Sequence, residues 1–128
     1  MILFYADDDV EEIELFCLAL KMIDPSIDCV TAINGEKALA MLDRIEKPSL
    51  IFLDLNMPLV DGKQVLKELK RNTRLKNVPV IIYSSMDNDE TIKEVIDLGA
   101  YKFLSKTYSV DELAVKLRTI FQETLLLS

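Results

Sequence analysis

The chain has 128 residues, half of them apolar, and its 22 acidic and 15 basic residues give a formal net charge of −7. This length suits one folded domain with a single core, and we expect residues 1–128 to form it. The acidic balance, without a run of lysine or arginine, argues against binding to nucleic acid or anionic lipid.

No apolar run approaches the roughly 18 residues of a membrane helix, and the first residues lack both the basic start and the cleavage site of a secretory signal. We therefore expect a cytoplasmic protein that does not bind membranes. Cys17 and Cys29 are not in a CxxC arrangement. That spacing favours buried free thiols in a reducing compartment over a disulfide or a zinc site.

The first predicted element is an apolar strand over residues 2–6, which runs directly into Asp7, Asp8 and Asp9. From there the apolar residues recur every three or four positions, which predicts an amphipathic helix. Its inward face is predicted to comprise Val10, Ile13, Phe16, Cys17 and Leu20, and its solvent face Glu11, Glu12 and Glu14.

Residues 27–31 alternate between apolar and polar types, as expected of a strand at a sheet edge. After a turn at Asn34-Gly35, residues 36–45 are predicted to form a second helix, which Pro48 ends. The unbroken apolar run 50–53 then predicts a strand buried on both faces. It stops at Asp54.

A third helix follows Gly62, and the apolar run 78–83 predicts a fourth strand that ends in Ser84. The next helix begins near residues 87–89, has Ile92, Val95 and Ile96 facing inward, and stops at Gly99. Residues 101–104 are predicted to form a short edge strand before Ser105 and Lys106. The last helix begins at about residue 109.

Five strands that alternate with five helices predict a doubly wound α/β fold with a parallel sheet. The first, third and fourth strands are apolar throughout, so we place them in the centre, with the alternating second and fifth strands at the edges. This is compatible with the flavodoxin-like order 2-1-3-4-5. In that order Asp7, Asp8 and Asp54 meet at the switch point between the first and third strands.

Three carboxylates in one place repel one another, at a cost on the order of 4 kcal/mol for each pair about 4 Å apart at an effective dielectric of about 20. A bound cation removes this cost, and oxygen ligands without histidine or cysteine favour Mg²⁺. Ser84 and Lys106 reach the same edge. Each residue alone is more typical of a helix cap, a turn or a solvated charge, but together they supply the groups needed to transfer a phosphoryl group to an aspartate.

Along nearly its whole length the chain resembles the receiver domain of two-component response regulators, of the stand-alone single-domain type. Five motifs in the right order carry the resemblance: Asp7-Asp8, the segment from Leu53 to Pro58 with Asp61-Gly62, Ser84, Gly99-Ala100 and Lys106.

The resemblance implies that Asp54 accepts a phosphoryl group from a histidine kinase or a histidine phosphotransfer protein. It implies Mg²⁺ ligation by Asp8, Asp54 and the backbone carbonyl of Asn56, with Asp7 acting through water. Ser84 and Lys106 would each bind a phosphoryl oxygen, and Phe103 would be the aromatic switch residue. The protein would be a signalling phosphoacceptor and not an enzyme in the usual sense.

The resemblance also implies that output occurs by contact with a protein target, through the fourth helix, the fifth strand and the fifth helix. We expect no effector domain after the fifth helix. Leu125 to Leu127 are interpreted either as packing of the last helical turn or as an exposed contact patch.

Three positions depart from the family pattern. Thr107 follows Lys106 where the family usually has proline, and a cis bond before a residue other than proline costs about 2.5 to 4 kcal/mol. We therefore expect a trans bond, with Lys106 still able to reach the acids. Phe103 stands where tyrosine is frequent. Lys102 stands where an acid often precedes that aromatic in the transcription-factor branch, so the dimer salt bridges of that branch are not assumed.

Three other functions fit parts of this pattern. A flavodoxin needs a phosphate loop rich in hydroxyls and glycine after the first strand, where this chain has three aspartates. A phosphatase of the haloacid dehalogenase type has its nucleophile motif after the first strand, and Asp54 follows the third. The remaining alternative is a receiver-like interaction module that works without phosphorylation.

Overall fold

The computed structural model describes residues 1–124, which form five strands and five helices in strict alternation. Along the chain they are β1 (Ile2–Ala6), α1 (Val10–Ile23), β2 (Asp28–Ala32), α2 (Gly35–Leu42), β3 (Leu50–Leu53), α3 (Gly62–Arg71), β4 (Val80–Ser84), α4 (Asp89–Asp97), β5 (Lys102–Ser105) and α5 (Val110–Thr124). Each predicted element is present, with bounds that differ by a few residues at most ends.

All strands are parallel, in the order β2-β1-β3-β4-β5, so the predicted flavodoxin-like arrangement is confirmed. The central strands β1, β3 and β4 are the ones with continuous apolar runs. The register pairs Ala6 with Leu53. The next residues, Asp7 and Asp54, therefore leave two neighbouring strands at the same level of the same edge.

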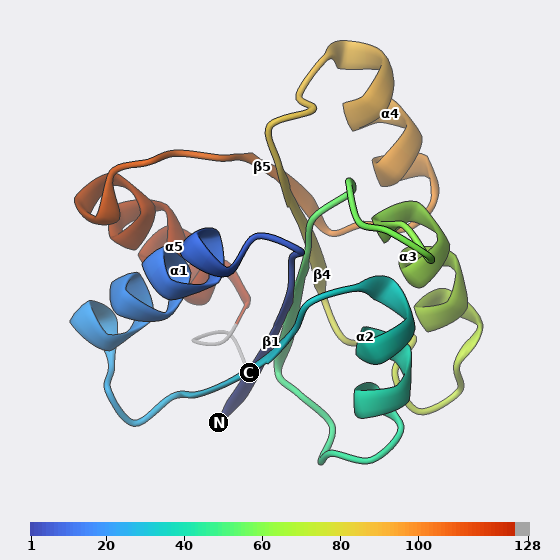
Figure 1. The fold of residues 1–128 in the computed structure, drawn as a ribbon, viewed down its shortest axis with the longest axis horizontal. Coiled ribbons are helices and arrows are strands. Elements are labelled where there is room, and N and C mark those ends of the chain that lie inside the picture. The colour runs from blue at the N-terminus through green and yellow to red at the C-terminus, as the bar shows by residue number, and fades with distance from the viewer. Residues whose placement is uncertain (125–128) are drawn as a thin grey trace.

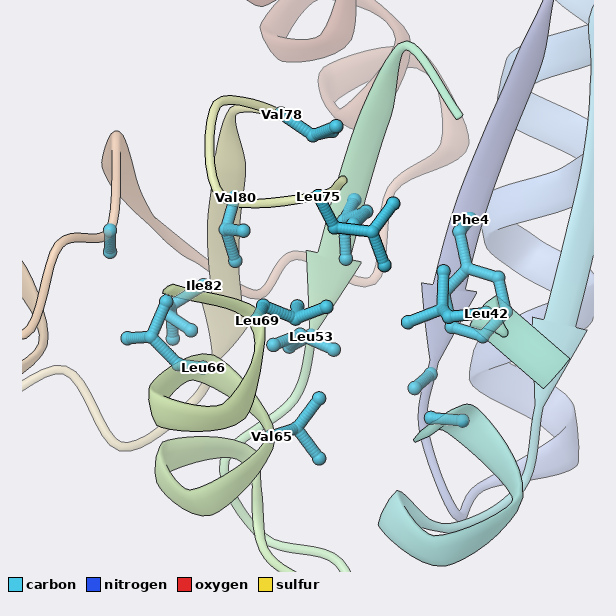
Figure 2. Packing of buried hydrophobic residues seen from close by; sticks show 14 of the residues in the cluster. Phe4, Leu42, Leu53, Val65, Leu66, Leu69, Leu75, Val78, Val80 and Ile82 are labelled. Atoms are coloured by element: carbon cyan, nitrogen blue, oxygen red, sulfur yellow. The ribbon is translucent and has the colours of Figure 1, made fainter. Parts of the chain in front are cut away.

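Helices cover both faces of the sheet, with α1 and α5 on one face and α2, α3 and α4 on the other (Figure 1). Alternate residues of each central strand supply the two cores. On the α1/α5 face Leu3, Tyr5 and Phe52 pack with Phe16 of α1. On the opposite face Phe4, Leu53, Val80 and Ile82 pack against the apolar residues of α2 and α3 (Figure 2).

The helix ends follow side-chain chemistry. Asp9, Asn34, Asp61 and Asn88 are the N-caps of α1 to α4, and each side chain accepts a hydrogen bond from a backbone N–H of the first turn. Gly99 has φ +108, a left-handed conformation that suits glycine, and the predicted end of α4 at this residue is confirmed.

Two predicted inward residues are exposed instead. Val10 is 57% exposed because it is the first residue of α1, at the rim of the sheet, where no neighbouring element covers it. Ile96 is 43% exposed. It belongs to α4, which packs along the β5 edge of the sheet and buries only Thr91 and Val95.

No helix within residues 1–124 is both long enough and apolar enough to cross a membrane. The two interpretations of Leu125 to Leu127 concern residues outside the part of the chain that the structure describes.

Candidate functional site

Asp7 begins the site at the carboxyl end of β1. Its side chain is completely buried. The backbone N–H of Asp9 donates to Oδ1 at 2.9 Å, and the Tyr5 hydroxyl donates to Oδ2. These donors fix the carboxylate at the edge of the sheet. Nothing in the sequence pattern distinguishes Tyr5 from the rest of its apolar strand.

Asp54 follows β3 and is 5% exposed. Its backbone N–H donates to the carbonyl of Ala6 at 3.0 Å, which continues the sheet pairing by one residue. The N–H of Asn56 lies 3.4 Å from Oδ1. The first residue of α3, Gly62, lies so close that a Cβ there would be 2.2 Å from the Asp54 carbonyl oxygen.

Lys106 connects the acids. Its backbone N–H donates to the carbonyl of Ser84 at 3.1 Å, and its side chain is 7% exposed. The ammonium Nζ lies 2.8 Å from Oδ2 of Asp7 and 3.0 Å from Oδ2 of Asp54. No peptide bond in residues 1–124 is cis, so the expected trans bond before Thr107 is confirmed, and Lys106 still reaches both aspartates.

Glu12 is a member of this cluster that the helical pattern placed wrongly on the solvent face. Its carboxylate is half-buried and forms an ion pair with Lys106. Carboxylate oxygens of Asp7, Glu12 and Asp54 all lie within 4.8 Å of one another. Glu12 is three residues after the N-cap Asp9, a position from which an acidic side chain reaches back toward the helix start. That spacing is the signal that could have identified it.

The cluster shares one ammonium among three carboxylates, which shifts the affinity of each group for a proton. Burial raises the pKa of Asp54 and of Glu12, and the charge of Lys106 only partly offsets this effect. Burial acts in the same sense on Asp7, but hydrogen bonds from Lys106, Tyr5 and Asp9 hold the pKa of Asp7 below its usual value. Burial alone would lower the pKa of Lys106, but its acidic partners raise it.

The other predicted site residues lie around this centre. Asp8 and Asn56 are exposed at the same edge, outside the compact group of carboxylate oxygens. Ser84 is buried at the end of β4, and its hydroxyl accepts a hydrogen bond from the N–H of Met86 at 3.1 Å. Phe103 on β5 is half-buried and packs against the core on the face that α2, α3 and α4 cover.

The donor chemistry suits a hard cation. The chain has no histidine, and both cysteines lie elsewhere, so the edge offers only carboxylate, carbonyl and hydroxyl oxygens. Oxygen donors of this kind are the ligands that Mg²⁺ and Mn²⁺ prefer. Among residues 1–124, every buried side-chain nitrogen or oxygen has a hydrogen-bond partner, and Lys106 provides that partner for the acids.

Comparison with known proteins adds to this geometry. Residues 3–118 match the pattern of the response regulator receiver domain family. The DNA-binding dual master transcriptional regulator RpaA of Synechocystis is 30% identical over 118 residues, which are 92% of this chain and 48% of RpaA. The chain thus spans about half the length of that relative.

Two solved structures cover almost the whole fold. The phosphorylated cyanobacterial phytochrome response regulator RcpA is 29% identical, with a TM-score of 0.88 over 99% of this chain and 95% of RcpA. The Mn²⁺-bound form of response regulator Rcp1 is 26% identical, with a TM-score of 0.82 over 94% of this chain and 91% of Rcp1.

Proposed function

The chain belongs to the response regulator receiver domain family, and on that premise we propose that it is a phosphoacceptor switch modified at Asp54. One observation carries the proposal. The Asp54 carboxylate lies at the end of a central strand, 3.0 Å from the Lys106 ammonium and beside Asp7. A buried carboxylate with a cation next to it can act as a nucleophile toward phosphorus while the cation balances the charge that develops.

In the proposed reaction an oxygen of Asp54 attacks the phosphorus of a phosphohistidine on a partner protein. The O–P bond forms as the P–N bond breaks, and the imidazole leaves on the partner. The chain contains no histidine, so the donor must be another molecule: a histidine kinase or a histidine phosphotransfer protein. The protein contributes only to its own phosphorylation and dephosphorylation and is not a classical enzyme.

Mg²⁺ would be held by Asp8, Asp54 and the backbone carbonyl of Asn56, with Asp7 behind them, and would neutralise charge on the phosphoryl oxygens. Lys106 would turn from the carboxylates toward a phosphoryl oxygen. Its flexible stem already places the ammonium 3.0 Å from Asp54, the proposed acceptor.

The switch would operate through Ser84 and Phe103. The Ser84 hydroxyl is at the end of β4, which pairs with β5, and Lys106 directly follows β5; the hydroxyl could donate to a phosphoryl oxygen. Phe103 is only half-buried and could move inward once that hydroxyl moves. Its movement would change the surface of α4, β5 and α5, which is the proposed contact site for a downstream protein.

Acetyl phosphate with Mg²⁺ tests the acceptor directly. We expect mass spectrometry to show one added phosphoryl group on the wild-type protein and none on Asp54→Asn. Asp61→Asn is the matched control, because it removes the same charge from an exposed helix cap that asparagine also serves. Phosphorylation of Asp54→Asn at the wild-type level would refute the assignment.

The output is tested by a pull-down in which wild-type protein treated with acetyl phosphate is compared with Asp54→Asn treated in the same way. We expect at least one partner to depend on phosphorylation. Identical partners in both samples would favour the alternative function, an interaction module that works without phosphorylation.

A further inference from the structure

Cys17 and Cys29 lie side by side, away from the acidic site. Cys17 is on α1 and Cys29 is on β2, and their Sγ atoms are 3.4 Å apart. Both thiols are free. The register of β2 against β1 pairs Cys29 with Leu3, so the position of Cys29 is fixed by the sheet. The helix that covers this face brings Cys17 to it.

The exposure of the two thiols differs from the sequence-based expectation of fully buried residues. Both are half-buried. β2 is an edge strand, and Cys29 packs against the rim of the α1/α5 core and not within it. Both cysteines therefore keep partial exposure to solvent, which a residue in the interior of the sheet would not have.

The two thiols are chemically unequal. The hydrogen bond with Cys29 and the positive charge of Lys21, one helical turn along α1, lower the pKa of Cys17 to about 7. The hydrogen bond with Cys17 and burial raise the pKa of Cys29. Because the thiolate is the reactive form, Cys17 is suited to attack an electrophile at neutral pH, while Cys29 stays protonated beside it.

From this geometry we propose that Cys17 and Cys29 form a redox-active dithiol whose co-substrate is a peroxide. The Cys17 thiolate attacks one peroxide oxygen, the O–O bond breaks, and sulfenic acid forms at Cys17. The hydroxide or alkoxide that leaves takes up from solvent the proton that the Cys17 thiol had given to it, and departs as water or an alcohol. The Cys29 thiol then displaces hydroxide from that sulfur, and its proton leaves with the hydroxide as water. Two thiols lose two electrons in total, and the peroxide gains them.

The product is a disulfide between α1 and β2. The sulfurs must approach from 3.4 Å to the bonded distance of about 2.05 Å, and side-chain rotation can supply part of this movement. The bond closes the short segment 17–29, which contains the turn between the two elements. It would tether α1, the helix whose first turn carries Glu12. This redox site does not depend on phosphorylation of Asp54.

The test uses hydrogen peroxide at neutral pH on the wild-type protein, Cys17→Ser, Cys29→Ser and Asp54→Asn. We expect wild type to lose both free thiols, to lose the mass of two hydrogen atoms, to stay monomeric on a non-reducing gel, and to recover with dithiothreitol. Cys29→Ser should accumulate sulfenic acid that dimedone traps at Cys17. Cys17→Ser should react several-fold more slowly than Cys29→Ser, because Lys21 still favours the thiolate at Cys17, whereas burial still raises the pKa of Cys29.

Wild-type protein that forms sulfinic acid at Cys17 while Cys29 stays free would overturn the proposal. So would a disulfide found only between molecules, or equal reaction rates for the two serine variants. The wild-type result is decisive even if a serine variant folds poorly. Asp54→Asn should oxidise as wild type does, so failure of the phosphoacceptor function leaves this result unchanged.

Discussion

At the scale of single residues, the charge balance around Lys106 decides what the site can do. Three carboxylates surround one ammonium, so the metal-free cluster keeps an excess of negative charge. Asp7 is held by Tyr5 and a backbone N–H as well as by Lys106. Asp54 has fewer hydrogen-bond donors than Asp7, so the ionised form of Asp54 costs more to bury than the ionised form of Asp7.

Replacement of Asp54 by asparagine should therefore stabilise the metal-free protein at neutral pH. Burial raises the pKa of Asp54, so the folded state holds this proton more tightly than the unfolded chain does. The resulting stability is fully present below the ordinary carboxyl pKa of about 4 and is lost as pH rises through the folded-state value. Asparagine, which does not titrate, avoids that loss.

Denaturant unfolding in EDTA at pH 7 and at pH 4 measures this effect for wild type, Asp54→Asn and the exposed control Asp61→Asn. The free energy of unfolding of Asp54→Asn should exceed that of wild type at pH 7, and this difference should be smaller at pH 4. A less stable Asp54→Asn protein at pH 7 would mean that the ion pair with Lys106 outweighs the cost of burial.

Glu12 should slow phosphorylation by small anionic donors. Its carboxylate competes for Lys106 and repels an incoming phosphate. Glu12→Gln should raise the initial rate with acetyl phosphate by about fivefold, which corresponds to about 1 kcal/mol of barrier. Glu14→Gln, an exposed change of the same charge on α1, is the control. A slower Glu12→Gln protein would show that Glu12 assists the transfer.

At the scale of elements, two close approaches position the site. The first residue of α2, Gly35, is so near Val60 that a Cβ would lie 1.8 Å from its carbonyl oxygen. Gly62, the first residue of α3, is similarly close to Asp54, since a Cβ on Gly62 would lie 2.2 Å from the Asp54 carbonyl oxygen. The N–H of Gly62 donates to the carbonyl of Leu55 at 3.1 Å. The loop that carries the acceptor is thus packed between two helix starts.

Gly62→Ala should destabilise the protein by about 1 to 3 kcal/mol, because backbone and not a flexible side chain occupies the space that the methyl group needs. It should also reduce phosphorylation of Asp54, whose backbone must shift. The midpoint of urea unfolding and the rate with acetyl phosphate measure the two effects. Lys67→Ala, an exposed substitution in the same helix, should change neither stability nor rate. A stable and fully active Gly62→Ala protein would show that the backbone at Asp54 tolerates the added methyl group.

At the scale of the whole molecule, the chain has a net charge of −7, and several of its acids gather at one edge of the sheet. A cation bound there removes repulsion that exists only in the folded state. Binding to the folded state alone raises stability by RT ln(1 + [L]/Kd), or about 2.7 kcal/mol at a hundredfold excess over Kd.

Mg²⁺ should therefore raise the melting temperature of wild type, and this rise should be strongly reduced in Asp8→Ala and Asp54→Ala. Asp9→Asn should keep it, because Asp9 serves as the cap of α1 and asparagine can do the same. Thermal unfolding with and without Mg²⁺, with Ca²⁺ for comparison, provides the measurement. An equal reduction of the Mg²⁺-induced rise in melting temperature in all three variants would show that the acids act only through total charge.

The sequence alone predicted the order and type of the elements, because their signals are local. The unbroken apolar runs of β1, β3 and β4 reflect burial on both faces, and the alternating runs of β2 and β5 reflect exposure at the edges. That Asp7 and Asp54 are each the first residue after a strand is also local information, whereas their common level depends on the register that pairs Ala6 with Leu53.

Only the tertiary structure showed that Glu12 joins the site, that Val10 and Ile96 face solvent, and that Cys17 lies against Cys29. Helical periodicity says which residues share a face, but it does not say where that face ends or which strand lies below it. Those outcomes depend on how far α1 extends over the rim of the sheet and on the packing of α4 at its edge, and both arise from contacts between residues distant in sequence.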